Sequence, residues 1–263
     1  MTKKLRKASF PKQEYNKTFT QVTTNDSRFY EDGKKTYPSV TFVLSYYPKG
    51  KYFEEWLKKV GSNADFIAKR AADEGTIVHE LAEQYLKGDK IELVDPYTHS
   101  PKYSLKVWKM FLGFVDFWET SGAELLETEV FLYSDTLNIA GTCDLVCKID
   151  GEVWVIDLKT SNNLQTTYDI QSALYTRCYE ECYDVKVDRV GVLWLKSRSR
   201  GEDKNGKVLK GKGWLVHESP RSVDENLEIY THVRALFDIE HPVLKPLSEK
   251  YTTVVQIDGN IKD

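Results

Sequence analysis

Asp144, Asp157 and Lys159 lie on the two apolar stretches that flank the dipeptide Asp150-Gly151. This dipeptide favours a two-residue type I′ turn between antiparallel strands. Counting outward from such a turn sets Asp144 opposite Asp157, so their Cβ atoms should lie about 4.5 to 5.5 Å apart. Because side chains alternate along a strand, Lys159 should share the face of Asp157.

Two opposed carboxylates in a half-buried sheet repel each other unless a proton or a cation lies between them. Oxygen ligands suit Mg²⁺ or Mn²⁺, which bind one or two carboxylates and complete their shell with water and substrate phosphate. Lys159 would then point toward an attacking water or a scissile phosphate, as in a phosphodiesterase. The alternative is that Asp144 is solvent-exposed and that Asp157 and Lys159 form an ordinary surface pair. The opposition imposed by the turn favours the metal site.

The elements that would position these residues follow from the apolar spacing. Alternating apolar residues predict strands over 129–133, 138–149, 152–159, 189–195 and 214–217, and short strands over 19–22 and 28–30. Helical spacing predicts helices over 104–120, 167–181 and 223–237, a short helix capped by Ser39, and a helical stretch over 52–86 broken near Gly61 and Gly75. This order indicates an α/β or α+β domain.

Four motifs, taken in order, resemble the PD-(D/E)XK nuclease superfamily, and most closely its RecB-like, phage-type exonuclease branch. They are residues 75–80 (GTIVHE), 141–144 (GTCD), 157–159 (DLK) and 171–175 (QSALY). Residues 37–41 (YPSVT) are similar to the opening segment of phage-type members. The likeness runs from about residue 37 to 195 and implies a restriction-endonuclease-like core, in which helices flank a central mixed β-sheet.

The resemblance also implies roles for single residues. His79, Asp144 and Asp157 would be metal ligands, and the backbone carbonyl of Leu158 would be a further ligand. Lys159 would position or activate the attacking water. The activity implied is a DNA exonuclease that depends on Mg²⁺ or Mn²⁺.

Three further residues would support this site. The resemblance implies that Gln171 and Tyr175, one helical turn apart, contact DNA or brace the site, and that Glu129 is an auxiliary acidic residue. Simpler explanations exist for His79, which could form a surface pair with Glu83, and for Gln171 and Tyr175, which could only edge the core, Tyr175 as a packed aromatic. Their joint occurrence in the expected order favours the site.

The biological role implied is DNA recombination, replication or repair in a phage or a bacterium. A recombination enzyme of this kind would work beside a single-strand annealing or replication protein. Two alternatives stay open from the sequence: a structure-dependent endonuclease, and a catalytically inactive DNA-binding or assembly module that keeps the nuclease fold.

The cysteines predict neither an iron-sulfur cluster nor a structural zinc site. Cys143 stands where the superfamily name has proline, and the alternation of side chains sets Cys143 and Cys147 together on the apolar face opposite Asp144. The spacing C-x₃-C of Cys143/Cys147 and Cys178/Cys182 is unusual for zinc. Some related nucleases bind a cluster with cysteines near both ends of the core, but no cysteine follows Cys182.

The net charge of the 263-residue chain is −3, yet basic residues gather in two runs. Residues 1–17 and 196–212 each carry five more basic than acidic side chains. Any polyanion would therefore be held by local patches. We expect the second run to bind DNA through Arg198, Arg200, Lys207 and Lys210.

Domain organisation and location are also predicted. We expect a basic extension over 1–36, whose short strands could form a hairpin, and one nuclease domain over 37–263. That domain would comprise a helical part (39–121), a catalytic core (124–218) and a C-terminal helix (222–240). No apolar run approaches the roughly 20 residues of a membrane span, so we expect a cytoplasmic protein in a bacterial cell or phage-infected host.

Overall fold

The computed structural model of the protein describes residues 18–23, 27–195, 213–244, 254–255 and 261–262. At its centre lies a five-stranded sheet in the order β4-β5-β6-β7-β8. The strands are β4 (Glu124–Ser134), β5 (Ile139–Ile149), β6 (Glu152–Lys159), β7 (Arg189–Leu195) and β8 (Trp214–His217). Within this sheet β6 and β7 are parallel and the other neighbours are antiparallel, so the predicted mixed α/β fold is confirmed.

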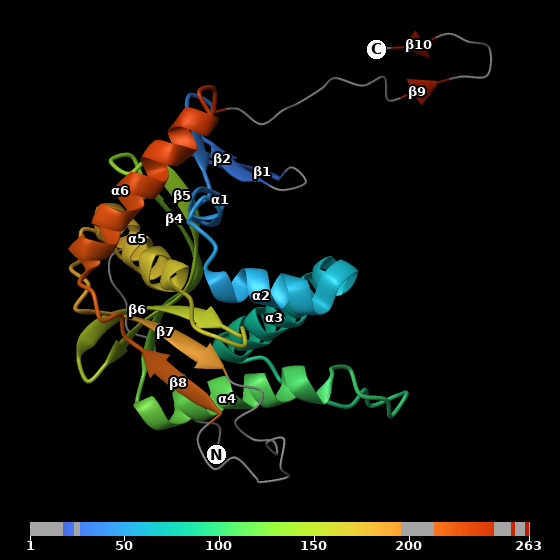
Figure 1. The fold of residues 1–263 in the computed structure, drawn as a ribbon. Helices are drawn as coiled ribbons and strands as arrows, with labels where there is room; N and C mark the ends of the chain where they lie inside the picture. The colour runs from blue at the N-terminus through green and yellow to red at the C-terminus, as the bar shows by residue number, and fades with distance from the viewer. Residues whose placement is uncertain (1–17, 24–26, 196–212, 245–253, 256–260, 263) are drawn as a thin grey trace.

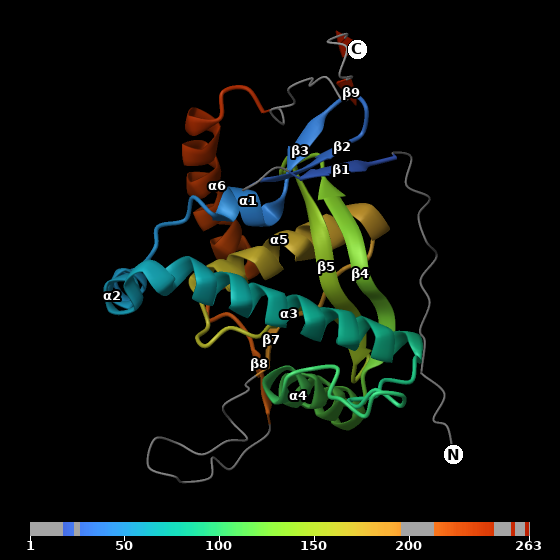
Figure 2. The same cartoon turned by 90° about the vertical axis from the view of Figure 1, so that its right-hand side faces the viewer.

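Helices cover both faces of the sheet (Figures 1 and 2). They are α1 (Val40–Leu44), α2 (Lys51–Val60), α3 (Ala64–Lys87), α4 (Leu105–Ser121), α5 (Thr166–Tyr183) and α6 (Val223–Glu240), with a 3-10 turn, η1, at Gly61–Asn63. α1, α5 and α6 pack on one face, where Val146 and Val155 are buried. α3 and α4 pack on the other face, over Leu145 and Ile156. Each fully buried aliphatic side chain stabilises the fold by about 1.5 to 3 kcal/mol.

The turn between β5 and β6 forms as predicted. Asp150 and Gly151 have φ angles of 52° and 86°, the left-handed values that a type I′ turn requires. Pairing continues in the expected register as far as Leu145 opposite Ile156. Asp144 and Asp157 occupy the next position, just beyond the end of this ladder.

The sheet alternation fails at one predicted position. Cys147 lies on the α3–α4 face as expected, but Cys143 packs on the opposite face with Val146 and Cys178. The prediction for Cys143 was wrong because the alternation is interrupted where β5 stops pairing with β6. All four cysteines are free and buried, and burial raises the pKa of the Cys147 thiol to about 12.

Two other expectations were wrong. Gly75 does not break the helix, since α3 continues through it from Ala64 to Lys87, whereas Gly61, with φ of 56°, does end α2. β4 begins at Glu124, five residues before the expected start. A bulge between Leu125 and Glu127 interrupts the alternation of side chains, so alternating apolar residues do not predict this first part of the strand.

A second sheet lies beside the first. It contains β1 (Thr20–Thr23), β2 (Arg28–Glu31) and β3 (Thr36–Pro38), and the last of these strands was not predicted. Tyr30 and Tyr37 pack against Phe131 and Tyr133 of β4. Ser39 then caps α1, as expected, by accepting a hydrogen bond from the backbone N–H of Phe42.

Two short strands near the C-terminus, β9 (Val254–Val255) and β10 (Ile261–Lys262), pair with each other. Among the helices that the structure describes, none combines the length and the apolar character needed to span a membrane.

Candidate active site

The candidate site lies where β5 and β6 separate. Beyond Leu145, the side chain of Asp144 continues the link between the strands, because its Oδ2 accepts a hydrogen bond of 2.6 Å from the backbone N–H of Leu158. The opening of the ladder gives side chains from both helical layers access to the same point.

His79 reaches this point from the middle of α3. Its Nδ1 lies 3.2 Å from Asp144 Oδ1 and 3.8 Å from Glu129 Oε1. Burial alone would lower the pKa of His79, but the two carboxylates outweigh it and raise the pKa to about 10. Burial acts to raise the pKa of Asp144, yet His79, Lys159 and the N–H of Leu158 hold it below its usual value.

Glu129 is turned toward the site by an unusual backbone conformation. Its φ of 46° is left-handed, which costs about 1 to 3 kcal/mol for a residue other than glycine and occurs preferentially at functional sites. His79, Glu129 and Asp144 each offer one ligand atom, and these three atoms lie within 4.8 Å of one another. Glu129, for which the sequence implied only an auxiliary role, therefore belongs to the same cluster as His79 and Asp144.

Asp157 and Lys159 form a second part of the site. Asp157 is buried, and its Oδ2 lies 2.6 Å from Lys159 Nζ, while its Oδ1 has no hydrogen-bond partner among the described residues. Burial, together with the charge of Asp144, raises the pKa of Asp157 to about 6 against the opposing effect of Lys159. Asp157 thus pairs with the lysine and lies outside the cluster of three.

α5 supplies Gln171 and Tyr175, both buried, with Gln171 Nε2 3.5 Å from the Tyr175 hydroxyl. A Cβ at Gly141 would lie 2.9 Å from the Tyr175 hydroxyl, so the glycine of the GTCD motif makes room for this ring. Burial raises the pKa of Tyr175, and the nearby carboxylates of Asp157 and Asp144 raise it further.

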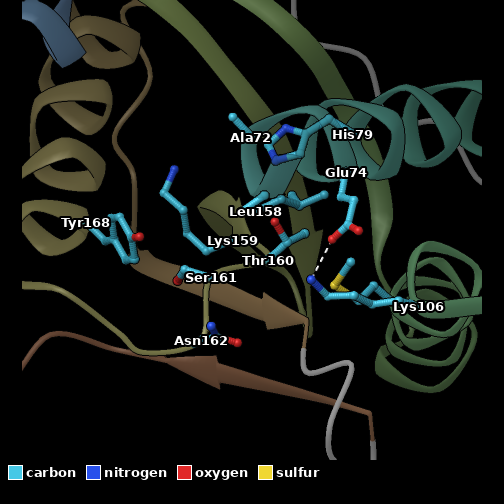
Figure 3. A pocket seen from close by; sticks show the side chains of 12 residues that line it. Ala72, Glu74, His79, Lys106, Leu158, Lys159, Thr160, Ser161, Asn162 and Tyr168 are labelled. Atoms are coloured by element: carbon cyan, nitrogen blue, oxygen red, sulfur yellow. Dashed lines mark hydrogen bonds and ion pairs between the residues drawn. The ribbon is translucent and has the colours of Figure 1, made fainter. Parts of the chain in front are cut away.

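A pocket of about 250 Å³ opens beside these residues and contains His79, Leu158 and Lys159 (Figure 3). The Tyr168 ring lies 5.0 Å from Lys159 Nζ on one side. On another side Glu74 and Lys106 form an ion pair of 2.5 Å. The sequence did not single out this lining, which also includes Thr160, Ser161 and Asn162. Tertiary packing alone brings together the helices and the loop that carry these residues, so no local pattern in the sequence groups them.

The donor set fits a hard divalent cation. It combines an imidazole nitrogen with carboxylate oxygens, and the buried Asp157 Oδ1 lacks a partner among the described residues. Of the predicted ligands, His79 and Asp144 are brought together, Asp157 lies beside them, and Leu158 lines the pocket. The predicted DNA-binding residues Arg198, Arg200, Lys207 and Lys210 lie outside the described residues.

Comparisons with known proteins give one broad match to a family and weak likenesses to solved structures, including the two that follow. No curated protein matches the chain. A solved structure of a candidate exonuclease from Eubacterium rectale shares 12% identity, covering 67% of this chain and 69% of that one, with a TM-score of 0.38. Another, of a protein designated SSO0001, shares 13% identity, covering 64% and 70%, with a TM-score of 0.27.

The broad match is to a family. The model that describes the PD-(D/E)XK nuclease superfamily matches residues 50–241, which is most of the chain and includes both parts of the candidate site. The protein belongs to the PD-(D/E)XK nuclease superfamily.

Proposed function

We propose that the protein is a metal-dependent deoxyribonuclease that degrades DNA from its ends during recombination, replication or repair. The observation that carries this proposal is the convergence of His79, Glu129 and Asp144 beside the Asp157–Lys159 pair at the wall of an open pocket. Nuclease family membership is in keeping with it.

Mg²⁺ or Mn²⁺ would be held by His79, Asp144 and Asp157, with Glu129 close enough to contribute. When bound, such an ion polarises the phosphoryl group and stabilises the negative charge that develops on it. The buried carboxylates supply the negative charge that selects a cation. Asp144 stays ionised for this purpose, because its pKa is held below the usual value.

Lys159 would orient the reacting groups as a cation. Burial acts to lower the pKa of Lys159, but Asp157 and Asp144 outweigh it and raise the pKa, so the amine is protonated at neutral pH. A protonated amine donates hydrogen bonds to a phosphate oxygen or to the attacking water and cannot itself accept a proton. Asp157 and the Tyr168 ring together hold the ammonium group at the pocket wall.

The proposal is tested with purified protein and two forms of the same plasmid, one linearised and one covalently closed. We expect Mg²⁺ or Mn²⁺ to support loss of the linear form while the closed form persists, and a chelator to prevent the loss of the linear form. Cutting of the closed form would instead identify an endonuclease. No cleavage with any ion would contradict the nuclease proposal and leave a DNA-binding or assembly module.

An enzyme that resects ends leaves single strands, so we expect a single-strand annealing or replication protein to act beside it in the cytoplasm of a bacterium or a phage-infected host. Co-purification of such a protein with the tagged nuclease tests this expectation.

A further inference from the structure

α2, η1 and the first turns of α3 form an arm that extends from the body of the protein (Figure 2), here called the aromatic arm (residues 51–72). None of the residues in α2 is buried. Tyr52 and Phe66 are 87% and 69% exposed, and Phe53 is 38% exposed. Several aromatic side chains exposed on this scale in one segment are typical of a binding surface.

The aromatic arm is continuous with the candidate active site. α3 runs without a break from the arm to His79, and Phe66 precedes His79 by 13 residues, which is about 20 Å of helix. Ala71 and Ala72 lie between Phe66 and His79 in the sequence and line the pocket that contains Lys159. Ala72 is labelled in Figure 3. A ligand lying along this helix would therefore reach the pocket directly.

The charges beside the rings favour a particular ligand. Lys49 Nζ lies 4.8 Å from the centre of the Phe53 ring, and Lys58, Lys59 and Lys69 form no ion pair within the part of the chain that the structure describes. A second protein chain packed here would desolvate these lysines at a cost. A nucleic-acid strand would satisfy them, because its phosphates are anionic and its bases have flat faces that stack on aromatic rings.

The composition of the arm further favours a strand whose bases are unpaired. Residues 51–72 carry five basic and three acidic side chains, which is a small excess of positive charge. Proteins that bind duplex DNA chiefly through phosphates depend on a clear excess of positive charge. Sites for unpaired bases combine a positively charged surface that contacts the backbone with aromatic rings on which the bases stack, and lysines among exposed rings fit this class.

We propose that the aromatic arm binds the unpaired bases of a single DNA strand by stacking them on Tyr52, Phe53 and Phe66, and that the strand then follows α3 into the pocket. This inference rests on the proposed nuclease function and defines its preferred substrate as a single-stranded end or overhang. A span of about 20 Å accommodates roughly six nucleotides at the stacked spacing of about 3.4 Å.

The test compares the double variant Tyr52→Ala/Phe66→Ala with wild type and with Tyr97→Ala, which removes an aromatic side chain of 90% exposure outside the arm. Binding of a labelled 12-nucleotide single strand and of a 12-base-pair duplex is measured by anisotropy in Ca²⁺, over a salt series. A second single strand carries 2-aminopurine, whose fluorescence falls when it stacks.

We expect the double variant to bind the single strand about 5- to 150-fold more weakly for each stacked base lost, with an unchanged salt slope. Duplex binding should change little, 2-aminopurine quenching should diminish, and Tyr97→Ala should resemble wild type. The conservative variant Phe66→Trp should retain both affinity and quenching.

Wild-type single-strand affinity in the double variant would overturn the inference, as would equal losses for single strand and duplex. A change of molecular mass by light scattering, with DNA binding unaltered, would assign the arm to contact between copies of the protein and also overturn the inference.

Cleavage of linear DNA is assayed in parallel. If wild type cleaves while the double variant binds normally, the inference alone fails; if binding depends on the arm but wild type does not cleave, the proposed function alone fails.

Discussion

Asp157 and Lys159 form the ion pair at the pocket wall, and we predict that either Asp157→Asn or Lys159→Ala abolishes DNA cleavage. The amide of asparagine fills the same space as the carboxylate, whose ionised form is disfavoured by burial, so the fold should persist. Cleavage rates and thermal melting measure the two effects separately. Lys90→Ala is the control, since Lys90 pairs with Glu92 on an exposed loop. Wild-type rates in either site variant would refute the assignment.

The buried carboxylates also predict that a divalent ion stabilises the protein. A ligand that binds the folded state alone, present at about 100 times its Kd, adds about 2.7 kcal/mol to the free energy of unfolding. We therefore expect millimolar Mg²⁺ or Mn²⁺ to raise the melting temperature of wild type and to have little effect on Asp144→Asn. Equal melting shifts in both proteins, or none in wild type, would argue against an ion bound by Asp144.

Single residues show what the sequence can and cannot predict about the site. The Asp150-Gly151 turn is encoded locally, so the register that brings Asp144 near Asp157 could be counted from it. The turn of Glu129 toward His79 depends on a left-handed φ inside an irregular strand. No local signal distinguishes such a residue from an ordinary exposed glutamate, and its cluster with His79 therefore needed the structure.

Gly75 is a glycine whose importance comes from packing between elements. A Cβ at this position would lie 2.9 Å from Thr160 Oγ1, in the residue that follows Lys159. We predict that Gly75→Ala lowers the free energy of unfolding by about 1 to 3 kcal/mol, as overpacked sites do, and reduces cleavage by displacing α3 from the end of β6. Thermal melting and cleavage assays check both effects.

Thr160→Ala removes the atom that the new methyl group would meet. The double variant Gly75→Ala/Thr160→Ala should therefore recover much of the lost stability, and a double-mutant cycle measures this coupling. Additive losses would show that the cost of Gly75→Ala arises elsewhere.

Some helices and strands could be predicted more accurately than others, because only some of them have a local signal in the sequence. α4, α5 and α6 have regular apolar spacing and were placed within a few residues of their observed bounds. Glycine propensity suggested a break in α3 at Gly75, but a close approach to Thr160 explains the glycine instead. The three residues of β3 are too few to show a period, so pairing with β2 alone reveals them.

At the scale of the whole molecule, the charge is unevenly divided, and one basic run leaves the sheet near the site. The segment 196–212 connects the end of β7 to the start of β8, and in register Trp194 of β7 lies beside Lys159. We predict that replacing Arg198, Arg200, Lys207 and Lys210 with alanine weakens DNA binding for all sequences.

The expected loss has a distinct dependence on salt. Each phosphate contact removed should flatten the slope of log affinity against log salt by roughly 0.7 to 0.9. Titrations in Ca²⁺ across a salt series measure this slope, and the aromatic-arm variants, which should keep it unchanged, are the matched comparison. Unaltered affinity and slope in the fourfold variant would place the DNA path elsewhere, for example along the basic residues 1–17.

The irregularity of β4 also affects how the protein behaves in concentrated solution. β4 is the outermost strand of the five-stranded order, and among the described strands it has a sheet neighbour on one side only. A long, straight edge strand is a template on which another chain can add and start aggregation. The bulge between Leu125 and Glu127 and the left-handed Glu129 interrupt that template and leave acidic side chains along it. We therefore expect the distortion that turns Glu129 toward His79 also to limit self-association of the protein through this edge.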